Sequence, residues 1–529
     1  MNNTRDHKDT EAAVEQVDSA DFETASSLTG FGWYNYLILF TSLVCSLSHQ
    51  FSSSSMSYLL PAAQCDLQMQ PSDKGLLNSI TFAGMVATSF LWGFLSDMLG
   101  RRKLLVIAYF LDGALNFIGS FTQSFAFLVA IKFLSGAILC GPNSIQKTFI
   151  SEFHCLKYRT VIMILSGFLY AIATIIIPVV AWLIIPMSWS VTIFGDYITY
   201  NSWRMFVTVG SFASFLASFL IYLCPESPKF LMTKGSMDEA MQAFRTMYRF
   251  NTGKKPETYP VKQLKEEVKT VTELSSSVDS RKANCSLVKV AMHESKRLLL
   301  KPFRSRAVMI MIIQFSTLLC SNTIRLWVPQ MFASAEEYKE HQKYTNKTDE
   351  IASVCEMISF TGVSNYSTAT NEESCGVAMI KNTVYINNII VACSQTVFFL
   401  LASYIVKYMG KKMTMVTGYI GAAVCSISVY WTYSPSAALA CLALFVSFTG
   451  VSHITSLAVL VDMFPTNLRT MAMGLNSLSG QLGTFTGNYS FPYLLAADCI
   501  APFSMLTALV LVTAGVTLLL PDTNKASLQ

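Results

Sequence analysis

The sequence predicts an all-α membrane protein with twelve transmembrane helices arranged as two six-helix bundles. Hydrophobic residues make up 52% of the 529 residues and charged residues 13%, about half of the roughly 25% usual in soluble domains. The apolar residues come in blocks of about 20, the length of a helix that crosses roughly 30 Å of hydrocarbon. Three motifs also recur in the same order in both halves of the chain. The small net charge of +5 excludes a nucleic-acid-binding protein, and the composition excludes a disordered chain and a coiled coil.

The apolar blocks form two groups of six, separated by a long charged segment. The N-terminal tail is polar and acidic, so we do not interpret it as a signal peptide. The expected domains are a cytoplasmic tail at 1–32, a six-helix bundle at 33–224, a cytoplasmic linker at 225–306, a second bundle at 307–520 that includes an exterior loop at 333–383, and a cytoplasmic tail at 521–529. The expected spans are 33–61, 76–96, 104–121, 124–147, 160–184, 203–224, 307–332, 384–406, 413–432, 436–460, 472–496 and 501–520.

The distribution of Lys and Arg predicts the orientation in the membrane, because cytoplasmic loops carry an excess of both. The linker at 225–306 contains 17 basic and 9 acidic residues, whereas the loop at 333–383 contains 4 basic and 8 acidic residues. Arg101-Arg102-Lys103 and Lys411-Lys412 fall on the same side as the linker. We therefore expect this side, and both termini, to be cytoplasmic.

The exterior loop carries two expected glycosylation sites and two cysteines. Asn346 and Asn365 each begin an Asn-X-Ser/Thr sequon, which is modified on the lumenal face. Cys355 and Cys375 share this loop, where oxidation is permitted. We expect a disulfide between them, and two free thiols are the alternative. The 13 cysteines of the chain show no CxxC and no His/Cys cluster, so we expect no metal site.

An internal duplication relates the two halves of the chain. Gly100-Arg101-Arg102 after the second span corresponds to Gly410-Lys411-Lys412 after the eighth. The segments Glu152–Arg159 and Asp462–Arg469, at the ends of the fourth and tenth spans, each begin with an acid and end with an Arg. Both correspondences have an offset of 310 (410 − 100 and 462 − 152), and a proline-acid pair follows the last span of each half. Six-helix repeats that flank a midplane cavity are typical of one large class of transporters.

The turn after the second span has the composition of a gate. Gly93 allows two helices to approach closely, and Asp97 ends the span at the membrane interface. Arg101 and Arg102 can pair with Asp97 or with a neighbouring helix end, where carbonyl groups favour cations. We interpret these groups as a gate that holds one conformation closed, and a hairpin that only obeys the positive-inside rule is the alternative. Lys407 stands in the second copy where Asp97 stands in the first, so we expect that gate to be weaker.

The acid and Arg positions of the repeat complete the expected charge networks. We interpret Glu152 with Arg159, and Asp462 with Arg469, as structural or gating groups. An enzyme's acid–base pair is not supported, because no nucleophile arrangement and no metal-ligand spacing accompanies them. No kinase or nucleotide motif is present, so we expect neither a cofactor nor ATP-driven transport.

Polar groups deep in membrane spans are costly, and each is therefore a candidate for contact with a solute. His49 and Gln50 lie mid-span beside the serine run Ser52–Ser55, for which interhelical hydrogen bonding is the alternative. Arg325 either faces the cavity and attracts an anionic group or snorkels to the exterior. Trp327 either stacks on a ligand or anchors at the interface. The cavity candidates are His49, Gln50, Asn322, Arg325, Trp327, Asn388, Gln395, His453, Asn476 and Gln481.

Three further ionisable groups and two linker segments have alternative interpretations. Asp112 pairs with another helix or acts as a functional acid. Lys132 snorkels to the exterior or faces the cavity. His453 carries a proton near physiological pH or is a satisfied structural histidine. Apolar spacing predicts amphipathic helices at 237–248 and 261–271 in the linker.

The motifs resemble those of the major facilitator superfamily, over residues 31–523. The turn from Gly93 to Arg102 resembles its signature loop, with Met98 where the family usually has a basic residue. The segments 225–231 and 462–469 resemble motifs of the sugar and organic-ion porter group. Residues 22–32 and the glycosylated loop resemble the synaptic vesicle glycoprotein 2 branch of that group. The resemblance implies a twelve-helix fold in which the cavity candidates face a central, polar and nearly uncharged cavity.

We therefore expect a membrane transporter of a small organic solute, either an organic ion or a polar metabolite. It is expected to work by alternating access, as a uniporter or coupled to an ion. The alternative is a transporter-fold glycoprotein of secretory or synaptic vesicles with a regulatory or receptor role, which the lack of a carboxylate at residues 48–55 favours. The expected location is the plasma membrane or a vesicle membrane. The expected partners are the solute and the lipid bilayer, not nucleic acid, and the expected state is a monomer.

Overall fold

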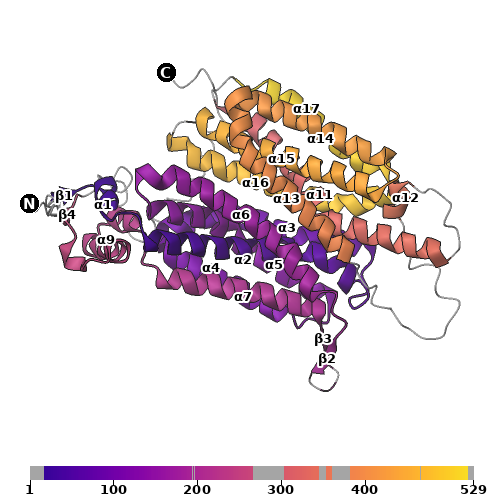
Figure 1. The fold of residues 1–529 in the computed structure, drawn as a ribbon, viewed down its shortest axis with the longest axis horizontal. Helices are drawn as coiled ribbons and strands as arrows, with labels where there is room; N and C mark the ends of the chain where they lie inside the picture. The colour runs from indigo at the N-terminus through magenta and orange to yellow at the C-terminus, as the bar shows by residue number, and fades with distance from the viewer. Residues whose placement is uncertain are drawn as a thin grey trace, which may run out of the picture.

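The computed structural model describes residues 17–193, 195, 197–265, 303–344, 353–359, 382–464 and 466–521. These residues form two bundles of long helices that lie side by side (Figure 1). The N-terminal bundle consists of α2 (Trp33–Ala63), α3 (Pro71–Leu99), α4 (Arg101–Gly119), α5 (Phe125–Glu152), α6 (Leu156–Ile184) and α7 (Ser202–Leu223). The C-terminal bundle consists of α11 (Arg304–Tyr344), α13 (Asn382–Met409), α14 (Lys411–Ser428), α15 (Pro435–Met463), α16 (Thr466–Ala497) and α17 (Ile500–Leu518).

Each expected span coincides with one of these helices, which confirms the predicted fold class of two six-helix bundles. Among the described residues, eight helices are long and apolar enough to cross a membrane, or nine if α1 (Phe22–Leu28) and α2, which meet at a bend of 107°, count as one span. The other three, α3, α4 and α16, carry more polar residues. They lie packed against other helices of the two bundles, where polar side chains find partners away from lipid.

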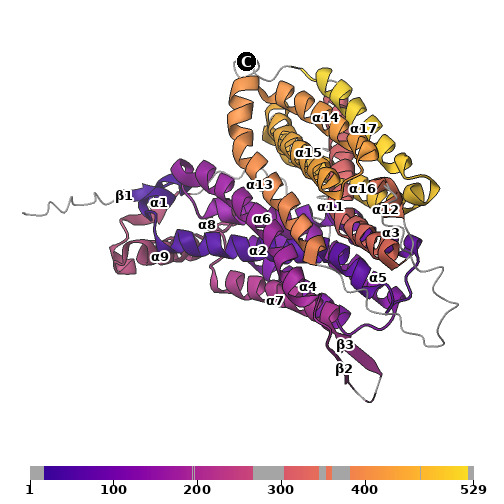
Figure 2. The same cartoon turned by 45° about the vertical axis from the view of Figure 1, so that its right-hand side comes forward.

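The two ends of the molecule carry different small elements (Figures 1 and 2). At one end lie β1 (Val17–Ala20), α1, α8 (Pro228–Thr233), α9 (Met237–Thr252), the 3₁₀ turn η1 (Pro256–Thr258) and β4 (Val261–Leu264). At the other end lie α12 (Val354–Ser359) and the 3₁₀ turn η3 (Val429–Trp431) of the C-terminal bundle, and the hairpin of β2 (Ser190–Ile193) and β3 (Ile198–Asn201) of the N-terminal bundle. We call these the linker end and the α12 end.

Glycines allow the closest helix contacts within each bundle. An added Cβ at Gly136 of α5 would overlap the carbonyl oxygen of Thr81 on α3. In the second bundle an added Cβ at Gly483 of α16 would overlap the carbonyl oxygen of Phe315 on α11. Small residues permit such backbone approach, and dispersion contacts then stabilise helix pairs that lie in lipid.

The linker end contains one predicted helix and one element that the sequence analysis assigned wrongly. The helix predicted at 237–248 is confirmed as α9, whose buried face includes Phe244 and Met247. The helix predicted at 261–271 is wrong over its described part, because Val261–Leu264 is a strand that pairs in parallel with Val17–Ala20. The partner strand comes from the N-terminal tail, about 240 residues away in the sequence, and no local pattern reveals such pairing.

The α12 end corrects two further expectations. Helix α11 continues to Tyr344, so the seventh helix does not end near residue 332 as predicted. Cys355 forms a disulfide with Cys499, which immediately precedes α17, and not with Cys375 as expected. The Val354 amide donates to the Thr432 carbonyl, and this backbone bond places α12 over the end of the C-terminal bundle. Cys375 and the two sequon asparagines, Asn346 and Asn365, lie outside the described residues.

Candidate functional site

A central cavity lies between the two bundles. It has about 420 Å³ of space, part of which is open to solvent. Helices α2 and α6 line it from the N-terminal bundle, and helices α11 and α13 line it from the C-terminal bundle. The lining residues are Gln50, Ser54, Ser57, Tyr58, Thr174, Ile177, Arg325, Leu326, Asn388, Val391, Ala392 and Gln395.

Helical spacing explains which part of the serine-rich α2 reaches this cavity. Gln50, Ser54, Ser57 and Tyr58 occupy positions i, i+4, i+7 and i+8, so they form one stripe on the helix. The other stripe, which includes Ser52, turns into the N-terminal bundle. The serine run therefore faces the cavity on one side of the helix and forms an interhelical hydrogen bond on the other.

Four of the ten predicted cavity residues line the cavity: Gln50, Arg325, Asn388 and Gln395. Gln50 is held by the Tyr170 hydroxyl, which donates to its carbonyl oxygen at 3.2 Å, and by its own amide, which donates to Thr174. Asn388 donates to the Val384 carbonyl at 2.8 Å. Tyr58 and Thr174 also line the cavity but were not predicted, because a single Tyr or Thr in an apolar span gives no distinguishing signal.

Six predicted cavity residues do not line it. Trp327 packs in the C-terminal core, 5.0 Å from the Phe491 ring centroid. The His49 ring centroid lies 6.4 Å from that of Tyr170, and His453 lies 3.0 Å from the Gln314 amide. Asn322 donates a hydrogen bond to Thr484 at 2.9 Å. Asn476 is buried with its carbonyl oxygen unpaired, and Gln481 is partly buried on α16. The hypothesis that Trp327 stacks on a ligand is therefore wrong in this conformation.

A polar network fills the interior of the N-terminal bundle. Asp112 is fully buried and accepts hydrogen bonds from Ser52, Ser135, Ser214 and Asn116, at 2.6–2.9 Å. Its carboxylate thus has several donors from other helices, as a buried charge requires.

Lys132 completes this network. Its ammonium donates to the Asn116 carbonyl oxygen at 2.7 Å and to Ser55 at 3.4 Å, and it lies within electrostatic reach of Asp112. Lys132 therefore neither snorkels to the exterior nor lines the cavity, so both interpretations from the sequence are wrong. The pairing of Asp112 with other helices is confirmed.

The first repeat motif forms a compact charge cluster at the linker end. Gly100 has a φ of +91°, which a tight turn between α3 and α4 requires and which glycine adopts freely. Arg101 Nε lies 3.7 Å from the Glu152 carboxylate. The Glu226 carboxylate accepts from the Arg102 amide at 2.9 Å, at the positive N-terminus of α4. The surroundings of Gly93 and of the Asp97 side chain lie outside what the structure describes.

The second repeat motif has the same geometry. Gly410 has a φ of +75°, and Lys411 forms an ion pair with Asp462. The two ion pairs are thus equivalent in the repeat. Lys411 follows Arg101 by 310 residues (411 − 101), and Asp462 follows Glu152 by the same number (462 − 152). Arg101 and Glu152 both belong to the N-terminal bundle, and Lys411 and Asp462 both belong to the C-terminal bundle. Each ion pair therefore joins two helices of the same bundle.

Neither repeat arginine forms an ion pair with the acid that begins its own segment. Arg159 pairs with Glu23 of α1 at 2.7 Å, and not with Glu152. Arg469 has no hydrogen-bond partner at Nε, since Asp462 pairs with Lys411. In each segment the acid lies at the end of one helix and the arginine lies in the next helix. A spacing of seven residues across such a break does not place the two side chains on one face, so spacing alone does not predict that they pair.

The α12 end of the passage is closed by contacts between the bundles. The Asn78 amide on α3 donates to the Leu326 carbonyl at 3.3 Å and to Asn488 at 3.5 Å. An added Cβ at Gly75 would lie 2.6 Å from the Pro492 ring. Towards the linker end, by contrast, Gly474 of α16 has no atom within 4 Å of an added Cβ.

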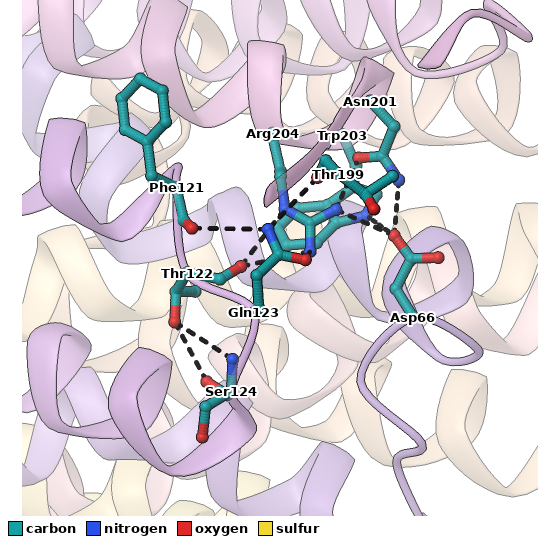
Figure 3. Close-up of polar contacts among 9 residues, drawn as sticks. All are labelled: Asp66, Phe121, Thr122, Gln123, Ser124, Thr199, Asn201, Trp203 and Arg204. Atoms are coloured by element: carbon teal, nitrogen blue, oxygen red, sulfur yellow. Dashed lines mark hydrogen bonds and ion pairs between the residues drawn. The ribbon is translucent and has the colours of Figure 1, made fainter. Parts of the chain in front are cut away.

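A further buried charge, which was not among the predicted site residues, stabilises the α12 end of the N-terminal bundle. Arg204 of α7 is 1% exposed and forms an ion pair with Asp66 at 3.0 Å. It also donates to the Thr122 carbonyl and to Gln123, and its guanidinium lies 4.2 Å from the Trp203 ring centroid. Figure 3 shows these groups converging from three chain segments around one guanidinium.

Comparison with known proteins agrees with this architecture. A model of the Major Facilitator Superfamily matches residues 42–366 and 351–529. The chain is 25% identical over 335 residues to synaptic vesicle glycoprotein 2B of Rattus norvegicus, which covers 61% of this chain and 49% of that protein. It is 32% identical over 222 residues to synaptic vesicle glycoprotein 2A of Homo sapiens, which covers 42% of this chain and 29% of that protein. The chain thus spans less than half the length of these relatives.

Solved structures share the fold at low sequence identity. The xylose transporter XylE from E. coli, in a partially occluded inward-open conformation, aligns with a TM-score of 0.64 at 14% identity, over 94% of this chain and 100% of that one. A D-xylose–proton symporter aligns with a TM-score of 0.62 at 16% identity, over 93% and 99%. The two matched segments of the family model together cover most of the sequence, and the chain therefore belongs to the Major Facilitator Superfamily.

Proposed function

We propose that this protein carries a small polar organic solute across a membrane by alternating access between its two bundles. One observation carries the proposal: the central cavity takes its lining from both bundles, and contacts between the bundles close the passage at the α12 end. Rocking of one bundle against the other would open those contacts and expose the same cavity to the opposite side. The family and the D-xylose–proton symporter of similar fold support transport as the activity.

We further propose that the linker end is cytoplasmic and the α12 end faces the exterior or a vesicle lumen. The excess of Lys and Arg at the linker end supports this orientation, as does the disulfide at the α12 end, which forms in oxidising compartments. Both termini then lie on the cytoplasmic side. The relatives named synaptic vesicle glycoproteins support a vesicle membrane, and the plasma membrane is the second candidate.

Alternating access is tested with a cysteine in the cavity. Gln395→Cys places a thiol on α13 where it lines the cavity. A membrane-impermeant thiol reagent should modify it from the linker side, and more slowly from the α12 side as the bundles rock. Rates are taken relative to the unsubstituted chain, which has other free thiols such as Cys140 and Cys393.

A cross-link provides the control that separates alternation from leakage. Gly75→Cys with Pro492→Cys places two Cβ atoms close together across the bundle interface, within reach of a disulfide. Oxidation should abolish modification of Gln395→Cys from the α12 side, and reduction should restore it. Each single cysteine is the matched control. A cavity that is never labelled from the α12 side would contradict the proposed transport.

A regulatory or receptor role is the second candidate, and the folded α12 end is the observation that favours it. Helix α11 projects beyond its span to Tyr344, and the disulfide of Cys355 with Cys499 holds α12 on the bundle. This arrangement gives the exposed end a fixed shape that a partner can recognise. Absence of alternation in the labelling experiment, in a folded sample, would favour this role.

A further inference from the structure

We infer that the solute is an organic anion whose carboxylate binds Arg325 in the central cavity. This inference rests on the proposed transport function and specifies the chemical class of its substrate. It narrows the expected organic ion or polar metabolite to an anion, because Arg325 is the one charged residue in the described lining of the cavity.

Arg325 is positioned to bind a ligand and not to snorkel. Its side chain is partly buried and lines the central cavity between the two bundles. From there it acts electrostatically on His49, Tyr58 and Tyr170 of the other bundle. Its buried Nε has no hydrogen-bond partner.

Lys147 adds a second positive charge to the passage. It belongs to α5 of the N-terminal bundle, yet it lies within electrostatic reach of both His49 and His453, which belong to different bundles. Its side chain is nevertheless exposed. An exposed ammonium within electrostatic reach of groups in both bundles contributes positive charge to the space between them.

No carboxylate balances these charges among the described groups of the passage. The described lining of the cavity contains one charged residue, Arg325, and no acid. Three acids of the described helices are engaged elsewhere: Asp112 inside the N-terminal bundle, Glu152 with Arg101, and Asp462 with Lys411. A cation within a membrane span normally has an anionic partner, and here the solute can supply it.

The remaining lining residues suit a carboxylate attached to a small organic body. A guanidinium binds a carboxylate through two parallel N–H···O bonds. The amides of Asn388 and Gln395, on the same side of the cavity, provide donors and acceptors for further polar groups. Tyr58 and Ile177 provide apolar surface opposite them. Lys147 would raise the local concentration of anions at the entrance through long-range attraction.

Charge-selective modification of Gln395→Cys tests the inference without knowledge of the substrate. The rates with an anionic (sulfonatoethyl) and a cationic (trimethylammonioethyl) methanethiosulfonate are compared from the linker side. Arg325→Gln should lower the ratio of anionic to cationic rate by about tenfold, because loss of one unit charge affects the two reagents in opposite directions. Arg325→Lys should preserve the ratio. Lys254→Gln, at an exposed site of the linker, is the matched control and should leave it unchanged.

A second measurement tests the chemical class directly. Thermal stability of the purified protein is measured with a panel of carboxylates, each paired with its neutral amide, such as benzoate with benzamide. At least one carboxylate should stabilise the protein, its amide should bind about tenfold more weakly, and Arg325→Gln should abolish the effect. An unchanged rate ratio in Arg325→Gln, or stabilisation by no carboxylate, overturns the inference. Labelling of Gln395→Cys from one side only would instead contradict transport itself, so the two failures are distinguishable.

Discussion

Replacement of Arg204 by methionine should destabilise the N-terminal bundle more than any surface charge substitution. Methionine retains much of the apolar stem but removes every N–H donor of the guanidinium. The change breaks the ion pair with Asp66. It removes the hydrogen bonds that the guanidinium donates to the Thr122 carbonyl and to the Gln123 side chain. It also removes the contact of the guanidinium with the Trp203 ring.

The magnitude follows from the difference in burial between the two charges. Breaking a buried ion pair by removal of one partner costs about 3–5 kcal/mol. Arg204 is 1% exposed but the Asp66 side chain is 32% exposed, so water can solvate the carboxylate once it is left alone. Asp66 also keeps the indole N–H of Trp203, which donates to it at 2.7 Å. We therefore expect a loss of about 2–4 kcal/mol in the free energy of unfolding.

Thermal unfolding of the purified protein in detergent, followed by intrinsic fluorescence, measures this loss. Asp66→Asn should lower the apparent Tm by less than Arg204→Met, because the amide still accepts one hydrogen bond. Lys262→Gln breaks the exposed ion pair with Asp18 and is the matched control, expected to leave the Tm unchanged. An Arg204→Met protein with the Tm of the Lys262→Gln protein would refute the reasoning that this buried charge stabilises the bundle.

Three further predictions concern the two ends of the molecule. Cys355→Ser should lower the stability of the C-terminal bundle by about 2–4 kcal/mol, because the bond to Cys499 closes a segment of 144 residues. Reductant should lower the Tm of the parent by more than that of the variant, which keeps the disulfide of Cys65. Burial lowers the pKa of His154 below its ordinary 6.5, with Arg159 acting in the same direction. The folded state therefore favours the neutral ring, so stability should fall as the pH drops below about 6.5, and Tm measurements between pH 7.5 and 5 should show a flatter profile for His154→Leu. Asn346→Gln and Asn365→Gln should each remove one glycan, seen as a step in gel mobility that matches partial deglycosylation of the parent.

The positions of the helices followed from the sequence because a membrane leaves few alternatives. A run of about 20 apolar residues in lipid forms a helix, since its backbone groups have no water to bond. The repeat motifs were equally readable. Gly100 and Gly410 both adopt positive φ, and their following basic residues pair with acids at equivalent positions.

Partners that lie far apart in the sequence could not be assigned in the same way. Cys355 was expected to pair within its own loop, yet tertiary packing brings it to Cys499. The strand at Val261–Leu264 forms because the N-terminal tail supplies its partner, and by spacing alone it resembled an amphipathic helix. Trp327 and Arg325 are two residues apart on one helix, and the helical turn sends the first into the core and the second to the cavity.

The sequence by itself thus determined the class of protein, the two-fold repeat and the set of polar residues from which a site could be built. Hydrophobic blocks and their spacing are local properties, and the bilayer converts them directly into helices. Only the tertiary structure decided that Gln50, Arg325, Asn388 and Gln395 meet in one cavity while Asp112 balances Lys132 inside a bundle. Side-chain direction around a helix and the packing of one helix on another set these outcomes, and both depend on contacts between residues that are distant in the chain.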